Sequence, residues 1–433
     1  METIHRGEER VSTPLTVLLC LTVTVFLFQT LLENYIFAAS YLDEALAALY
    51  LGFFVVSVLT NLEMRGTDLM ICVLVVLVTA AGLYGNMRFQ IQQDRAAVVL
   101  DIVSHFKFAA IYLGAAILAR TPRFNWRRVI RIPALLAKAY LTVLFGFGVL
   151  NLFKDIGMHS EYRHGLRCYA FVFGTPGIVI NTVLFIMMLL LMESAVGREN
   201  AEGPAREINN RGFLIMAIAV LLFVVKTRGL ILAAASALLF ESFLIEDRQE
   251  MRYRLGAIAA VGGILGFPQF QEYFVSGVKA SQGRAPRLMF FEGGVQLFKE
   301  YFPFGTGFGT FGSSSAATHY SPLYYQLGFD KIPGMQPTDT RYLNDTFWPM
   351  IFGQLGLVGT IPFVILFFLV LWEIYRAGAK SGSRTIRFAV YLYVINVLFS
   401  SIQSAYPSNN SMVMLTFIVT LMSLYRREGT DGH

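Results

Sequence analysis

Charged side chains are scarce in this chain of 433 residues, and that scarcity is the first guide to its class. Only 15% of the residues are charged, whereas soluble domains carry roughly 25%. Hydrophobic residues make up 55% of the chain, and the mean hydropathy is +0.56. These values argue against an ordinary soluble domain and indicate an all-α polytopic membrane protein.

Cysteine and histidine are also rare. Cys20 and Cys72 lie inside apolar runs and Cys168 lies at a helix edge, so a disulfide scaffold is not expected. His159 and His164 share a short predicted outer loop and His319 stands alone in the long one, and no pair of acidic residues flanks them at the spacing of metal ligands. We therefore expect no metal site and no cofactor. The net charge of +6 would suit nucleic acid, but many of the bases lie in short loops between apolar runs, so we expect no nucleic-acid partner.

Long apolar runs dominate the sequence. A membrane span needs about 20 mostly apolar residues, and about twelve runs approach that length. The first run is interpreted as an uncleaved span. The predicted spans are 15–32, 45–60, 69–84, 102–119, 133–150, 170–192, 212–225, 229–244, 255–270, 346–371, 386–402 and 410–424.

The distribution of bases sets the predicted orientation. Arginines gather in one set of short loops, most densely in "RTPRFNWRRVIR", and such loops face the cytoplasm. An even number of spans then places both termini in the cytoplasm. The resulting organisation is nine spans in 1–270, a long outer loop in 271–345, and three spans with a cytoplasmic tail in 346–433.

The predicted loop 271–345 is much longer than ordinary connections, which indicates an ordered, functional segment. It contains the run "FPFGTGFGTFGSSS", which lacks the strand-turn-helix context of a nucleotide loop. We expect this run to form a tightly turned loop packed on its aromatic residues. Tyr320, Tyr324 and Tyr325 could stack on sugars or form the core of the loop.

Polar residues at helix ends are the candidates for function. Arg228 lies in the turn "KTRG" between two short predicted spans, so it should sit below the outer surface, where ionisable groups usually mark a site. Asp345 lies at the mouth of the span 346–371 near Arg341, and it could instead cap that helix. Asp101 and His105 share a helix face, as a structural pair or a proton path.

Three stretches together resemble the O-antigen ligase/polymerase family of bacterial membrane glycosyltransferases. They are "KTRGLILAAASALLF", "GRAPRLMFFEGGVQLFKEYFPFGTGFGTF" and "RYLNDTFWPMIFGQLGLVGT". In the second stretch Arg287, Phe291, Pro303, Gly305 and Gly307 fill the positions of the motif of the family, and Gly356 and Gly359 match the end of the third. "RHGLRCYAFVFG", from Arg163 to Gly174, resembles a motif described for the polymerases.

The resemblance implies transfer of a glycan from undecaprenyl diphosphate to a sugar hydroxyl at the outer face of the bacterial inner membrane. Asp345 is then the candidate base with Glu292 in reserve, and Arg228 is catalytic as well as a diphosphate ligand. The other expected diphosphate ligands are Arg163, Arg284, Arg287 and Arg341. Expected partners are the lipid-linked oligosaccharide, membrane lipids, and a chain-length regulator and flippase of the same pathway.

The sequence also departs from the family. Asp345 occupies the position where ligases carry histidine, and Thr346 occupies that of the following asparagine. This departure favours a polysaccharide polymerase over a ligase. A ligase that joins glycan to a lipid or protein, and a flippase or transporter of lipid-linked oligosaccharide, remain alternatives.

Overall fold

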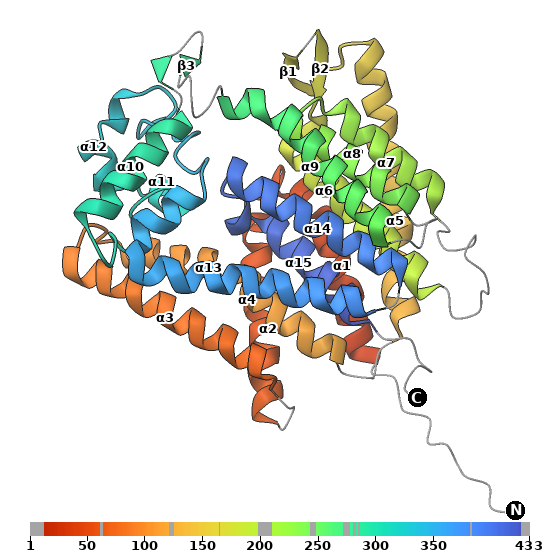
Figure 1. The fold of residues 1–433 in the computed structure, drawn as a ribbon, viewed down its shortest axis with the longest axis horizontal. Coiled ribbons are helices and arrows are strands. Elements are labelled where there is room, and N and C mark those ends of the chain that lie inside the picture. Colours follow the sequence, from red (N-terminus) through yellow and green to blue (C-terminus); the bar gives the residue numbers. More distant parts are fainter. Residues whose placement is uncertain are drawn as a thin grey trace, which may run out of the picture.

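The computed structural model describes residues 13–60, 64–120, 125–163, 165–197, 210–242, 248–271, 278–279, 283–284, 286–381 and 383–425. Helices dominate these residues (Figure 1). The N-terminal helices are α1 (Thr13–Glu33), α2 (Leu42–Leu59), α3 (Gly66–Phe89), α4 (Arg95–Arg120), α5 (Trp126–Phe153), α6 (Pro176–Val196), α7 (Arg211–Phe223), α8 (Thr227–Ser242) and α9 (Arg248–Phe270). The remainder are α10 (Pro286–Glu300), α11 (Ser314–Thr318), α12 (Pro322–Gln326), α13 (Trp348–Lys380), α14 (Arg384–Gln403) and α15 (Asn410–Leu424).

Eight of the described helices are long and apolar enough to cross a membrane, and α7, α8 and α15 contribute shorter apolar segments. The chain is therefore an all-α, multi-pass membrane protein in its main architecture. α6 shows why these runs are helical. It is a nearly continuous run of apolar residues whose one proline, Pro176, lies at the first helical position, and almost every side chain along it is buried by its neighbours. α6 thus lies at the centre of the main core.

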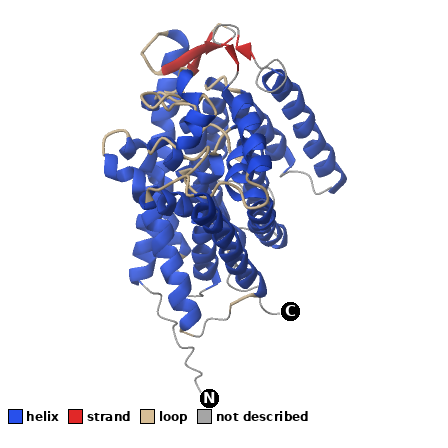
Figure 2. Ribbon diagram, turned by 90° about the vertical axis from the view of Figure 1, so that its left-hand side faces the viewer, coloured by secondary structure: helices blue, strands red, loops and turns tan. Residues whose placement is uncertain are grey.

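Short strands and single-turn helices complete the fold. β1 (His159–Arg163) pairs with β2 (Leu166–Tyr169), and β3 (Val278–Lys279) pairs with β4 (Gly283–Arg284), both antiparallel. Figure 2 shows the strands at one end of the helices, and Figure 1 shows that the two hairpins lie apart from each other. The 3₁₀ turns are η1 (Phe37–Tyr41), η2 (Phe171–Phe173), η5 (Phe329–Lys331) and η6 (Tyr406–Ser408). The sequence patterns did not reveal these elements.

The segment before α13 has a core of its own. Phe290, Phe311 and Phe329 pack with Tyr324 and Leu343, and all five are buried. Among the tyrosines of this segment, Tyr324 is therefore a core residue, Tyr320 packs against the core, and Tyr325 is 56% exposed. α10 packs against α13, and α11 packs against α4, at one side of the molecule (Figure 1).

α13 corrects the predicted span 346–371. The helix begins at Trp348 and continues to Lys380, and its backbone is non-helical at Gly356, where φ is 56° and ψ is −158°. A membrane-spanning helix is therefore present in this stretch as predicted, but it is longer than 346–371 and is kinked at Gly356. Glycine suits the break because L side chains rarely adopt a positive φ.

Candidate functional site

The glycine-rich loop fills the break in α13. The backbone N–H groups of Thr306 and Gly307 donate to the carbonyls of Gly353 and Gln354, at 3.1 and 2.9 Å, and Val358 N donates to Pro303 O at 3.1 Å. Helix groups that the break would orphan in an apolar setting are thus satisfied by the loop. The prediction of a tightly turned structural loop agrees with these contacts.

Close backbone packing explains two of the glycines in this loop. A Cβ on Gly305 would lie 2.3 Å from Gly356 N, and one on Gly307 would lie 2.5 Å from Asn86 N. The side-chain amide of Asn86 on α3 both donates to Phe308 O, at 2.9 Å, and accepts from Phe308 N, at 2.8 Å. The loop is therefore packed closely between α3 and α13.

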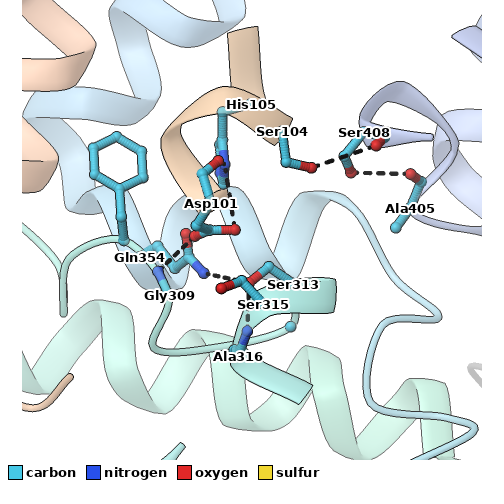
Figure 3. Close-up of polar contacts among 12 residues, drawn as sticks. Asp101, Ser104, His105, Gly309, Ser313, Ser315, Ala316, Gln354, Ala405 and Ser408 are labelled. Atoms are coloured by element: carbon cyan, nitrogen blue, oxygen red, sulfur yellow. Dashed lines mark hydrogen bonds and ion pairs between the residues drawn. The ribbon is translucent and has the colours of Figure 1, made fainter. Parts of the chain in front are cut away.

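Asp101 and His105 on α4 anchor the same loop (Figure 3). Asp101 Oδ2 accepts from Gly309 N at 2.5 Å, and His105 Nδ1 lies 2.8 Å from the Asp101 carbonyl oxygen. Both side chains are fully buried, and His105 meets Phe308 edge to face. Of the two predicted roles, these contacts favour the structural pair.

Arg287 and Asp345 meet at the entrance to α13. Nε and Nη2 of Arg287 both lie 3.0 Å from Asp345 Oδ2, so α10 and the start of α13 are joined by a charged pair. Asp345 is 31% exposed. The N-cap position of α13 is Phe347, which makes no side-chain capping bond, so Asp345 does not occupy the N-cap position of this helix.

Three further candidates lie in other settings. Arg163 Nε donates to Glu161 at 2.7 Å in the β1–β2 hairpin, where Glu161 also accepts from Lys226. Arg341 is 72% exposed and pairs with Asp339 at 2.7 Å. Glu292 is exposed on α10. Arg284 lies in β4, and its side chain is outside the described part of the chain.

Arg228 has a different environment. It lies in the first turn of α8, after a turn of three residues that follows α7, which agrees with the predicted tight connection. Its Nη2 donates to the amide oxygen of Asn181 on α6, and its guanidinium carbon lies 5.1 Å from the centre of the Tyr406 ring. Its Nε is buried and has no partner among the described residues. Asn181 and Tyr406, the two partners of the guanidinium, are both neutral.

No protein-family model matches this chain, and no curated protein matches it either. The site must therefore be judged from its own residues. Within the described ranges, no three His, Cys, Asp or Glu side chains are grouped so that they could hold a metal ion.

The structure contains a buried ionic cluster that the sequence patterns did not predict. Lys107 on α4 donates to Asp43 at 2.6 Å and to Glu44 at 2.8 Å, and Lys107 and Asp43 are 5% and 1% exposed. Gln29 on α1 donates to Asp43 Oδ1 at 3.1 Å. The sequence signal for this cluster was Lys107 and Gln29 inside predicted apolar spans. Ionisable and polar side chains at that depth are costly and usually have partners.

The chemical capacity of these sites differs. Arg163, Arg287 and Arg341 each face a carboxylate that would compete with an anionic ligand. Arg228 presents a guanidinium between the amide of Asn181 and the ring of Tyr406, without a carboxylate contact among the described residues. Such a group is suited to bind phosphate oxygens through its planar fork.

Proposed function

We propose that the chain is a polysaccharide polymerase of the bacterial inner membrane. It transfers a glycan from undecaprenyl diphosphate to the sugar hydroxyl of another lipid-linked repeat unit. The lipid diphosphate is already a good leaving group, so the protein has to stabilise the charge that grows on it and accept the proton of the attacking hydroxyl. Arg228 serves the first task, and Asp345, placed by Arg287, serves the second.

The setting of Arg228 is the observation that carries this proposal. Asn181 and Tyr406 hold the guanidinium without neutralising it, and Nε remains to donate. A partly buried cation that contacts no anion is costly, and a bound anionic ligand would offset that cost. These contacts support a diphosphate-binding role for Arg228 more strongly than for Arg341 or Arg163, the other expected ligands, which pair with carboxylates.

Substitutions at Arg228 and Arg341 test the proposal. Arg228→Ala should lower chain growth about 10²–10³-fold at normal protein levels, because it removes a positioned charge-stabilising group. Arg228→Lys should restore little, since a point charge lacks the fork. Arg341→Ala is the control and should stay near wild type, because that side chain is exposed and paired with Asp339. Near-normal chain growth in Arg228→Ala would refute the proposal.

The glycans of a deletion strain distinguish polymerase from ligase. Without a polymerase, single repeat units should still reach their final acceptor, but long chains should be absent. Without a ligase, long lipid-linked chains should accumulate and attachment should stop.

A flippase or transporter is the second candidate, and the cluster of Lys107, Asp43 and Glu44 favours it. Buried ionisable groups in membrane helices often mark a transport path. Loss of a flippase would leave lipid-linked repeat units on the cytoplasmic leaflet, whereas loss of a polymerase would leave them on the outer one. Labelling of intact spheroplasts with an impermeant sugar-specific reagent separates these outcomes.

The proposal also includes about twelve spans, cytoplasmic termini and a periplasmic segment 271–345. A reporter that fluoresces only in the cytoplasm, fused after Gly312, should stay dark. Bright fluorescence would reverse the orientation and remove the enzyme proposal with it.

A further inference from the structure

A chain of hydrogen bonds leads from Arg228 to a distant carboxylate, and every bond in it runs in the same direction. Arg228 Nη2 donates to Asn181 Oδ1, and Asn181 Nδ2 donates to Ser411 Oγ at 2.8 Å. The Ser411 hydroxyl donates to Asn410 Oδ1 at 3.2 Å, and Asn410 Nδ2 donates to Glu33 Oε1 at 2.7 Å. The chain therefore joins α8, α6, α15 and α1.

The direction of the donors gives this chain a polarity. Its cationic end is Arg228 and its anionic end is Glu33, with two amides and a hydroxyl aligned between them. Each bond polarises the next in a low-dielectric interior. Asn181 and Ser411 are 7% and 3% exposed, so water competes little for these contacts.

A remote counter-charge has an advantage over a direct one. A carboxylate in contact with the guanidinium would compete with an incoming phosphate, as Asp339 would at Arg341. Attraction between charges weakens as their separation grows, so Glu33 stabilises the cation without occupying its donors. The other end of the chain is itself fixed, because Gln29 also donates to Glu33 Oε1, at 2.9 Å.

We propose that Asn181, Ser411, Asn410 and Glu33 are positioning residues that orient the Arg228 guanidinium and supply its counter-charge at a distance, leaving Nε, which has no partner among the described residues, for a diphosphate. This inference rests on the proposed function for its ligand. It adds the residues that hold Arg228 in position to bind a diphosphate.

Thr182 provides a matched control. It is adjacent to Asn181 on α6 and is 2% exposed, and its hydroxyl lies 3.3 Å from that of Thr30 on α1. Thr182→Val therefore removes a buried polar contact between α6 and α1 but leaves the chain to Arg228 intact. Asn181→Leu removes the chain at similar side-chain volume, and Ser411→Ala interrupts it with a smaller change.

Calorimetry tests the role of this hydrogen-bonded chain. It measures the binding of farnesyl diphosphate and of farnesyl monophosphate to the purified full-length protein in detergent. The wild type should prefer the diphosphate, and Asn181→Leu and Ser411→Ala should reduce that preference about tenfold. Thr182→Val should change it less than twofold. A preference that survives in both chain variants overturns the inference, because a merely structural contact would leave the ratio of the two affinities unchanged.

A double-mutant cycle measured by thermal unfolding tests, without any ligand, whether the hydrogen-bonded residues act as one unit. If Glu33 and Asn181 belong to one unit, the decrease in Tm of Glu33→Gln/Asn181→Leu should be smaller than the sum of the two single decreases. The pair Glu33→Gln/Thr182→Val should be additive. If the wild type binds no farnesyl diphosphate, the proposed function fails. In that case a non-additive cycle still supports the hydrogen-bonded chain as one unit, and an additive cycle contradicts it.

Discussion

Arg287 on α10 holds Asp345 through two nitrogens, Nε and Nη2, each 3.0 Å from the same carboxylate oxygen. The two residues are 58 positions apart, and their pairing places a carboxylate three residues ahead of α13. The pair leaves the second oxygen, Oδ1, outside these two contacts. A carboxylate held in this way has a fixed orientation toward the helix mouth.

Asp345→Asn should be inactive or nearly so. The amide keeps an oxygen that Arg287 can bind, but it no longer accepts a proton, so chain growth should decrease about 10²–10⁴-fold. The exchange Arg287→Asp/Asp345→Arg re-forms the charged pair and should recover the Tm lost in Asp345→Ala without recovering activity. Polymer length on gels and the Tm in detergent measure the two effects. Wild-type activity in Asp345→Asn would reduce the role of Asp345 to that of orienting Arg287.

Gly305→Ala should destabilise the protein by at least about 2 kcal/mol. Its φ is +77°, and an added Cβ would lie 2.3 Å from Gly356 N, so backbone strain and overpacking act together. Gly328→Ala is the control, because its φ is +70° but nothing lies within 4 Å of its Cβ position. That variant should cost only about 1–2 kcal/mol. Equal decreases in Tm would show that loop packing on α13 contributes little.

Lys107→Met should destabilise the protein by about 3–5 kcal/mol, because it leaves Asp43 buried without its cation. The double variant Lys107→Met/Asp43→Leu should recover part of that loss. Arg376→Met serves as the control, since Arg376 is 52% exposed and lies 3.7 Å from Glu373, and its effect should be below about 1 kcal/mol. Thermal unfolding in detergent gives the comparison. No recovery in the double variant would argue against a direct charge pair.

The stability contributed by Glu161 should depend on pH. Partial burial raises the pKa of this carboxyl group, but Lys226 and Arg163 more than offset it and hold the pKa below its ordinary value of 4.5. A depressed pKa contributes stability that is present above about pH 4.5 and is lost as the pH falls through the lower, folded-state value. The difference in Tm between wild type and Glu161→Gln should therefore be constant near neutral pH and shrink below 4.5. A difference that grows on acidification would contradict this sign.

The sequence by itself determined the class of the protein and the position of most of its helices. Scarce charge and long apolar runs are local properties, because each membrane helix satisfies its own backbone hydrogen bonds. They located α1 to α9 and α13 to α15 but not α10 to α12, which lie in the predicted loop 271–345. The turn "KTRG" located Arg228 between α7 and α8. The glycine spacing likewise indicated a tight loop.

Tertiary structure alone decided which side chains meet. Glu33, Asn181, Arg228 and Asn410 come from four distant parts of the chain, and their polarised connection depends on which helix ends pack together. The partners of Arg287 and Lys107 were set in the same way. Hydrophobic periodicity records which face of a helix is buried, but it carries no information on which helix covers that face. The orientation and the partners of an arginine such as Arg228 therefore follow from packing, which no single segment encodes.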